Sequence, residues 1–239
     1  MLIEIGPNCA LIHDLSFCSD VAYAVPSNLT LANDTAALGV VYDNYTSDMY
    51  QNFNKSLQQI PCNTTASAQY SLAVNCTDCA HAYKDWLCAV TIPRCEDFSN
   101  EADYLQPRAV GYDFIGDYVG KFNGNPSLSP VNKALRYTNQ SRSQHIDDVI
   151  RPGPYKELLP CEDLCYGLVR SCPAALGFSC PLEGHGLNYS YGKPKPAGRD
   201  LSTCNFPGRA SNVAVTLQRA NPFATSMVII TVSFLLLGL

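Results

Sequence analysis

The segment PCEDLCYGLVRSCPAALGFSCP, residues 160–181, places four cysteines in a short stretch with helical periodicity. On an ideal helix, where each residue turns by about 100°, Cys161, Cys165, Leu168 and Cys172 fall within roughly 60° of one another. The sequence therefore predicts one helix with three sulfur atoms on a single face. These sulfur atoms could hold a metal ion, perform redox chemistry or form structural disulfides, and that choice decides the fold class.

The residues around this helix carry the signals of its two ends. Pro160 suits a helix start, and Glu162 and Asp163 lie in the first turn, where negative charge is favourable. Pro173 or Gly177 can end the helix.

Composition limits the kinds of protein that the chain can be. It has 239 residues, enough for one large domain or two small ones, and twelve cysteines, an even number too large for an ordinary cytosolic enzyme. Charged residues make up 15% and the net charge is −5, so nothing favours a nucleic-acid partner, which would need a basic face.

Sequons for N-glycosylation favour paired cysteines over metal-bound ones. Eight Asn-x-Ser/Thr triplets occur, and six precede residue 80. They begin at Asn28, Asn33, Asn44, Asn54, Asn63, Asn75, Asn139 and Asn188. Sequon use and disulfide formation both take place in the secretory pathway. We therefore expect a location there and on the extracellular face of the plasma membrane, with the endoplasmic reticulum as a further location.

Two more helices are predicted in the first part of the chain. An apolar stripe predicts a helix over 38–60, with Asn44 and Asn54 about 140° from the centre of the stripe. The stripe consists of Leu38, Val41, Tyr42, Tyr45, Met49, Phe53, Leu57 and Ile60. The segment 78–90, DCAHAYKDWLCAV, predicts a second helix capped by Thr77 or Asp78. Its buried side is expected to hold Tyr83, Trp86 and Leu87.

Both ends of the chain suggest processing in the secretory pathway. The opening MLIEIGPNC has no basic start and no apolar run of signal-peptide length, so we expect a signal to lie upstream. From Phe223 the last seventeen residues carry no charge. Small residues at 208–212, a polar spacer and this tail match the layout of a GPI-anchor signal. A transmembrane anchor and a buried core segment are the alternatives.

The cysteines could in principle bind a metal ion or act in redox catalysis instead of forming structural disulfides. Cys76, Cys79, Cys161 and Cys165 could supply four thiolates to zinc. Metal binding requires reduced thiols, however, and would leave the other cysteines unexplained. Redox catalysis through Cys76 and Cys79 lacks the βαβ setting that such motifs have. We expect no metal and no cofactor.

Catalytic patterns are also weak. The segment GFSCP lacks the second glycine of a nucleophile elbow, and the pairs 147–148 and 162–163 are adjacent acids that point apart on a helix. The histidines share no ligand spacing and are expected at the surface or in packing: His13, His81, His145 and His185. We therefore expect a protein that is not an enzyme. A cell-wall enzyme remains the rival class, and it would need converging carboxylates or a His-paired nucleophile.

The cysteine spacing resembles that of the frizzled-type cysteine-rich domain. The resemblance rests on C-x8-C-x6-C over 79–95 and on PC-x3-C-x6-C over 160–172. WLCAVTIPRC at 86–95, CSDVAYAVPSN at 18–28 and the GF of GFSCP also resemble segments of that family. The resemblance implies a disulfide-rich, mainly α, frizzled-like cysteine-rich domain with a long loop insertion and little β.

The same resemblance implies the cysteine pairing and the organisation of the chain. The implied pairs are Cys9–Cys95, Cys18–Cys88, Cys79–Cys172, Cys161–Cys204, Cys165–Cys180 and, as an extra bridge, Cys62–Cys76. The implied parts are 1–95 and 161–209 as the two portions of the cysteine-rich domain, 96–160 as a surface insertion, and 210–239 as a spacer and hydrophobic tail.

Within that superfamily, the cysteine number, the dense sequons and the insertion look most like the fungal stretch-activated calcium-channel component. That component is the auxiliary subunit of the high-affinity calcium-uptake channel and is similar to the auxiliary subunit of the sodium-leak channel. The resemblance implies a glycosylated, extracellular, non-catalytic regulatory subunit of a calcium-permeable, stretch-activated channel. Its implied partners are a large four-repeat pore-forming subunit and, through the tail or a GPI anchor, the membrane.

The partner-binding surface is expected in the insertion, because aromatic side chains often anchor interfaces. The candidates are Tyr104, Tyr112, Phe114, Tyr118, Phe122 and Tyr137. The alternative is that these side chains only hold the insertion onto the domain. The alternative function is a GPI-anchored, frizzled-like surface module that binds a lipid or another ligand.

Overall fold

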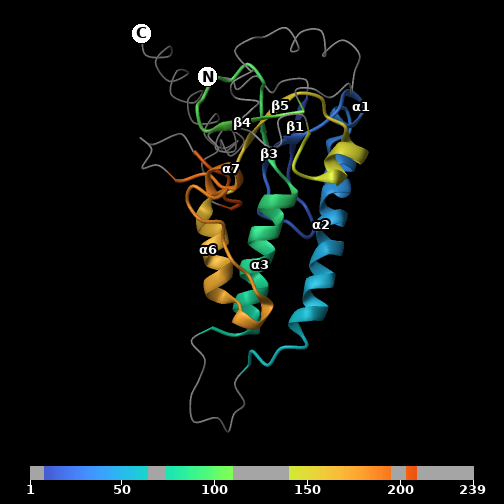
Figure 1. Ribbon diagram of the computed structural model, residues 1–239. Coiled ribbons are helices and arrows are strands. Elements are labelled where there is room, and N and C mark those ends of the chain that lie inside the picture. Colours follow the sequence, from blue (N-terminus) through green and yellow to red (C-terminus); the bar gives the residue numbers. More distant parts are fainter. Residues whose placement is uncertain (1–7, 64–73, 110–139, 195–202, 209–239) are drawn as a thin grey trace, which may run out of the picture.

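Three helices packed side by side and two small sheets at one end of them make up the fold (Figure 1). The computed structural model describes residues 8–63, 74–109, 140–194 and 203–208. The described helices are α1 (Leu29–Ala32), α2 (Thr35–Leu57), α3 (Cys76–Thr91), η2 (Ile146–Ile150), α6 (Glu162–Ser171), η3 (Ala174–Leu176) and α7 (Leu187–Ser190). The described strands are β1 (Cys9–Ile12), β2 (Tyr23–Pro26), β3 (Arg94–Glu96), β4 (Leu105–Arg108) and β5 (Tyr155–Leu158).

Local signals explain where the long helices begin. The Asp34 carboxylate accepts a hydrogen bond from the backbone N–H of Ala37 and so caps α2. Asn75 and Asp78 form a reciprocal capping box at the start of α3. The prediction of Thr77 or Asp78 as the N-cap is therefore wrong. The sequon asparagine Asn75 is the N-cap, and the Asp78 side chain accepts the backbone N–H of Asn75.

The helix predicted over 38–60 is confirmed as α2, but its buried face differs from the predicted stripe. Met49 is 37% exposed and Ile60 lies beyond the helix end. Asp43 and Thr46 are buried instead. The Asp43 carboxylate accepts the backbone N–H groups of Phe17 and Cys18, both at 2.8 Å. Paired polar groups can be buried at little cost, so the apolar stripe alone misplaces the contact face.

The strands form two antiparallel sheets. Strands β1 and β2 pair as a hairpin, with Cys9 opposite Pro26. The second sheet has the order β3-β5-β4, with Leu158 of β5 opposite Arg94 on one side and Leu105 on the other. Strand β5 comes from late in the chain and fills the gap between two earlier strands, so the sheet joins both halves of the sequence.

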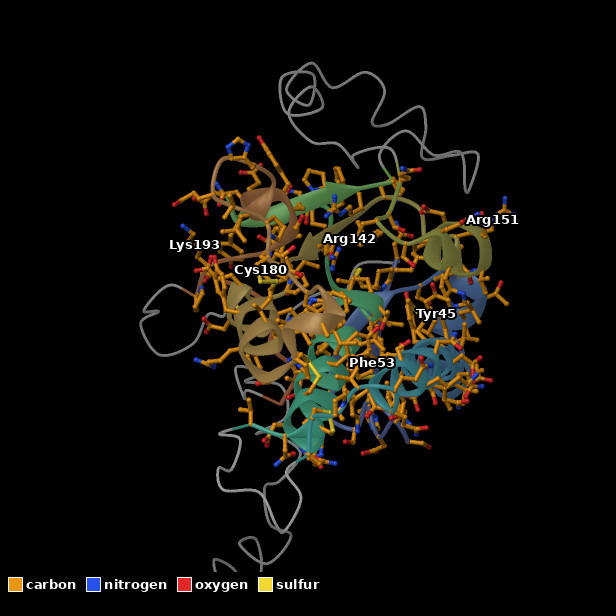
Figure 2. All side chains as sticks on the ribbon, turned by 60° about the horizontal axis from the view of Figure 1, so that its bottom comes forward. Tyr45, Phe53, Arg142, Arg151, Cys180 and Lys193 are labelled. Atoms are coloured by element: carbon orange, nitrogen blue, oxygen red, sulfur yellow. A yellow bond between two sulfur atoms is a disulfide. The ribbon has the colours of Figure 1, made fainter. Side chains whose placement is uncertain are left out.

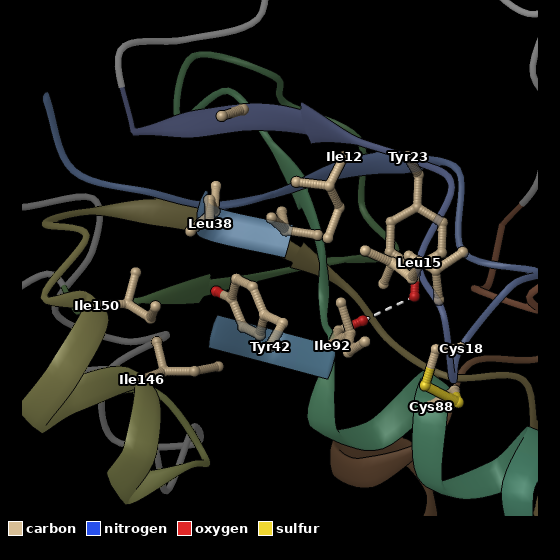
Figure 3. Packing of buried hydrophobic residues seen from close by; sticks show 13 residues of the cluster. Ile12, Leu15, Cys18, Tyr23, Leu38, Tyr42, Cys88, Ile92, Ile146 and Ile150 are labelled. Carbon is tan, nitrogen blue, oxygen red and sulfur yellow. Dashed lines mark hydrogen bonds between the residues drawn. A yellow bond between two sulfur atoms is a disulfide. The ribbon is translucent and has the colours of Figure 1, made fainter. Parts of the chain in front are cut away.

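The main core lies between the β1–β2 hairpin and helices α2, α3 and η2 (Figure 3). Buried hydroxyl groups in it have partners. The Tyr23 hydroxyl donates to the Ile92 carbonyl at 2.7 Å, and the Tyr42 hydroxyl donates to the Pro26 carbonyl at 2.8 Å. The cluster consists of Ala10, Ile12, Leu15, Cys18, Val21, Tyr23, Val25, Leu38, Tyr42, Cys88, Ile92, Ile146 and Ile150.

The range 96–160 is not a surface insertion along its whole length, which corrects the expectation from the sequence. Its described ends supply β4, η2 and β5, and Ile146, Ile150 and Leu158 are fully buried. The turn-rich, polar segments within the range hide this contribution, because the core residues stand in short strands and in the short helix η2. The middle of the range, 110–139, lies outside the described residues.

The segment 184–209 (the arm) has secondary structure within its described residues, 184–194 and 203–208. It forms α7, and single β-bridges join Cys161 to Gly192 and Pro160 to Asn205. The Asn205 side chain also donates to the Tyr23 hydroxyl at 3.1 Å. The arm therefore packs on the helix start of α6 and reaches the main core.

Candidate functional site

Six disulfides use all twelve cysteines. The Cα–Cα distances run from 4.5 Å for Cys79–Cys172 to 5.9 Å for Cys165–Cys180, which is normal for disulfides. The pairs are Cys9–Cys95, Cys18–Cys88, Cys62–Cys76, Cys79–Cys172, Cys161–Cys204 and Cys165–Cys180. Each is a pair that the resemblance to the frizzled-type framework implies.

Helix α6 carries the sulfur-bearing face that its sequence predicts. The N-cap Cys161 joins the arm at Cys204, Cys165 joins Cys180 beyond the helix, and the C-cap Cys172 joins Cys79 on α3. One helix is thereby bonded to three separate parts of the chain.

One bridge differs from the other five in what it connects. Three bridges lie within 9–95 and two lie within 161–204. Only Cys79–Cys172 crosses between these two regions, and it joins α3 to α6. Because no cysteine is left over, the covalent connection between the two regions, apart from the backbone, is this single bond.

The sequons are placed mainly at the surface of the described residues. Asn33, Asn44, Asn63, Asn75 and Asn188 are exposed, and Asn28 and Asn54 are half-buried. Asn139 lies outside the described residues. Glycans on the five exposed side chains would face solvent.

A buried ion cluster that sequence reasoning missed lies on the three-stranded sheet and includes Arg142, which Figure 2 labels. The Glu157 side chain on β5 is fully buried and accepts Arg108 Nε at 2.7 Å and Arg142 Nε at 2.6 Å. Burial by itself would raise the pKa of Glu157, but the charges and hydrogen bonds of Arg142 and Arg108 outweigh it, so this pKa lies below its usual value. The carboxylate therefore stays ionised at neutral pH.

This cluster contains one described residue shortly before the segment 110–139 and one shortly after it. Arg108 stands two positions before that segment and Arg142 three positions after it, and both bind the same carboxylate. The neighbouring Ser141 is 2% exposed, and its backbone N–H donates to Asp147 at 2.8 Å. The chain is thus fixed on β5 and η2 on both sides of the segment.

A second missed feature is a cluster of aromatic rings between α2, α3 and the turn after η3, in which Phe53 is buried and the other rings are half-buried. The Phe53 and Tyr83 rings stack with centroids 3.6 Å apart, and Tyr50 and Phe178 lie against them at 5.8–6.2 Å. Aromatic contacts at such distances stabilise packing beyond the area that they bury. The spacing of Tyr50 and Phe53 signals a shared helix face, but it does not reveal that α3 and residue 178 complete the cluster.

The described histidines lie at the surface or in a packing contact, as the sequence predicts. His13, His81 and His185 are exposed. The His145 ring stacks on Tyr45 with centroids 4.0 Å apart, and burial lowers the pKa of His145. The described residues contain no group of His, Cys, Asp and Glu side chains that could hold a metal ion.

Only one of the aromatic candidates for partner binding can be placed. Tyr104 is half-buried and directly precedes β4. Tyr112, Phe114, Tyr118, Phe122 and Tyr137 lie outside the described residues. Among the helices that are described, none is long and apolar enough to cross a membrane, and the apolar segment 223–239 is not among them.

The packed helices and six disulfides define a disulfide-rich, mainly α module with two small sheets. A family model described as "Mid1: Stretch-activated Ca2+-permeable channel component" matches residues 4–210, so the chain belongs to the Mid1 family. The resemblance to stretch-activated calcium-channel components is thereby confirmed.

Two relatives show the same relationship. The chain is 46% identical over 203 residues to the stretch-activated cation channel yam8 of Schizosaccharomyces pombe, covering 85% of this chain and 35% of the relative. It is 38% identical over 210 residues to the stretch-activated cation channel MID1 of Saccharomyces cerevisiae, covering 87% and 33%. The chain thus spans about a third of the length of these relatives. No solved structure matches the chain significantly.

Proposed function

We propose that this chain is the cysteine-rich part of an extracellular, glycosylated and non-catalytic auxiliary subunit of a calcium-permeable, stretch-activated cation channel, required for calcium influx. The observation that carries the proposal is the family match over residues 4–210. That range contains every cysteine from Cys9 to Cys204, so the matched region is the disulfide framework itself. The relatives are themselves named stretch-activated cation channels.

The full pairing of the cysteines supports a location outside the reducing cytosol. The exposure of Asn33, Asn44, Asn63, Asn75 and Asn188 supports their use as glycan acceptors. We assign the framework to the frizzled-like class, with 1–95 and 161–209 as its two portions and attachment to the membrane through the segment 210–239 or a GPI anchor.

In this proposal a large four-repeat partner subunit forms the pore. The chain binds the extracellular loops of that partner, aids its delivery to the surface or biases its gating. Biasing a gate requires that the chain bind the open and closed states with different affinities. A rigid module suits this role, because it loses little conformational freedom when it binds.

The proposed contact surface is the aromatic set on 104–137 together with the fixed ends of that segment. The Arg108–Glu157–Arg142 cluster supports this choice, because it anchors the flanking residues on the sheet. Aromatic side chains presented from an anchored base are typical anchors of interfaces.

The test is purification of the tagged full-length protein from membranes, combined with calcium uptake by cells that lack their own copy. The wild-type protein should bring down a four-repeat subunit and restore uptake. Joint substitution to Ala of Tyr104, Tyr112, Phe114, Tyr118, Phe122 and Tyr137 should abolish both. The matched control is Tyr166→Ala, which removes an aromatic ring 48% exposed on α6 and should leave both unchanged.

Two results would contradict the proposal in different ways. Consistent absence of a four-repeat subunit from the purified wild-type protein would refute the auxiliary role. Co-purification that survives the joint aromatic substitution would refute only the proposed contact surface.

A further inference from the structure

Asn28 begins a sequon, and its side chain is built into the fold. Its oxygen Oδ1 caps α1 by accepting the backbone N–H groups of Thr30 at 3.0 Å and Leu31 at 2.9 Å. Its nitrogen Nδ2 donates to the carbonyl of Ile150 at 2.8 Å. The amide thus uses both of its polar atoms at the junction of α1 with η2.

The bond to Ile150 connects distant parts of the chain. It spans 122 positions and reaches the last residue of η2, which is fully buried. A carbonyl at the end of a helix has no partner within that helix. Asn28 supplies the missing donor, and Arg151 directly afterwards leaves the helix in the left-handed conformation, at φ 52°.

Two other sequon asparagines, Asn75 and Asn44, use their amides differently from Asn28. The exposed Asn33 also donates through Nδ2, but only to the Leu29 carbonyl four residues earlier in α1, at 3.0 Å, so it makes no contact with a distant part of the chain. At Asn75 the oxygen Oδ1 caps α3, and no described residue accepts a hydrogen bond from Nδ2. Asn44 is exposed on the outer face of α2, and none of the described residues bonds to its side chain. N-glycosylation takes place on Nδ2, so at these two positions the reactive atom is open, whereas at Asn28 it is engaged.

We propose that Asn28 is a structural cross-link that stays unmodified in the folded protein, while Asn44 and Asn75 carry glycans. The inference rests on the glycosylation in the proposed function. The modification replaces one N–H of the amide with an N–C bond to the anomeric carbon of a polyprenyl-diphosphate-linked oligosaccharide, and the polyprenyl diphosphate leaves. The modified Nδ2 keeps only one N–H, so a glycan at Asn28 would have to fit into the half-buried junction directly beside the contact with the Ile150 carbonyl.

Site occupancy is the first test. The full-length protein is purified from a eukaryotic secretory host and treated with a glycosidase that converts each glycan-bearing Asn to Asp, and the peptides are weighed. We expect conversion at positions 44 and 75 and an unconverted Asn at 28. Conversion at position 28 in the folded, secreted protein would overturn the proposal.

Matched variants give a second test, because Thr30→Ala and Asn28→Asp both destroy the same sequon. Thr30 is exposed, so Thr30→Ala should keep the wild-type gel mobility and unfolding temperature. Asn28→Asp keeps an oxygen cap for α1 but replaces the donor to Ile150 with a second acceptor, so its unfolding temperature should fall. Equal unfolding temperatures for the two variants would overturn the cross-link.

The two tests separate failure of the inference from failure of the proposed function. If no sequon is converted, glycosylation fails as part of the proposed function, and the second test still decides the role of Asn28. If Thr30→Ala shifts the gel mobility by one glycan, Asn28 is an acceptor and the inference fails while glycosylation stands.

Discussion

Removal of the Cys79–Cys172 disulfide should cost more stability than removal of any short-loop bridge. The bond closes a loop with a sequence separation of 93. No other bridge gives a shorter path between Cys79 and Cys172, since every other bridge lies within 9–95 or within 161–204. The chain-entropy model gives about 4.6 kcal/mol for a loop of this length. Cys62–Cys76, with a separation of 14, gives about 3.0 kcal/mol. Typical domains have about 5–15 kcal/mol in total, so the crossing bridge holds a large share.

The assay combines unfolding with a cleavage experiment. The free energy of unfolding is measured by denaturant titration for Cys79→Ala/Cys172→Ala and for the matched control Cys62→Ala/Cys76→Ala. In parallel, a protease site engineered between positions 121 and 133 is cut, and the products are run on a denaturing, non-reducing gel. The wild-type and control fragments should stay joined until a reductant is added. The fragments of the Cys79→Ala/Cys172→Ala variant should separate without reductant.

The cleavage experiment does not depend on the energy estimate. Fragments of Cys79→Ala/Cys172→Ala that migrate together without reductant would show that another disulfide crosses between the regions, and the pairing would be refuted. A control variant that loses as much stability as the crossing variant would refute the loop-length argument alone.

Three further predictions concern single side chains. Glu157→Gln should cost about 3–5 kcal/mol in denaturant titration at pH 7, because two arginines lose their buried counter-charge. Since the folded pKa of Glu157 is lowered, the free energy of unfolding of the wild type should fall on acidification below about pH 4.3. The same acid dependence in Glu157→Gln would exclude this carboxylate as the cause. Gly192→Ala should destabilise the protein by about 1–3 kcal/mol, because the new Cβ would lie 2.7 Å from Cys204 Cβ. Gly167→Ala should stabilise it by up to about 1 kcal/mol, because a Cβ at this helical position has no atom within 4 Å. Similar melting temperatures for the two variants would contradict this contrast. Because the folded pKa of His145 is lowered, the unfolded chain binds a proton at this residue more readily than the folded chain, so the free energy of unfolding should fall as the pH drops below about 6.5. An unchanged pH profile of stability in His145→Phe would exclude His145 as the cause.

The helices were predictable because their signals are local. Periodicity and end residues place α2, α3 and α6, since an amphipathic helix repeats every 3.6 residues whatever it packs against. The sulfur face of α6 follows from the same period. Errors arise where a polar partner from elsewhere changes burial, as at Asp43, or where a sequon asparagine serves as a cap, as at Asn75.

The contribution of 96–160 to the core was not predictable for a related reason. Strand β5 is four residues long, and its central Glu157 reads as a surface charge. Burial of this charge depends on Arg108 and Arg142, which stand 49 and 15 positions away. The local sequence pattern around Glu157 does not predict these contacts with distant arginines.

The sequence by itself determined the membership of the Mid1 family, the helices and the even number of cysteines, because these depend on residue type and short-range spacing. The tertiary structure alone decided which residues of 96–160 are core, which carboxylate is buried between arginines, and which sequon amide is bonded to a distant carbonyl. Each of these depends on contacts between residues far apart in the chain, whose free energy exists only once the chain has folded.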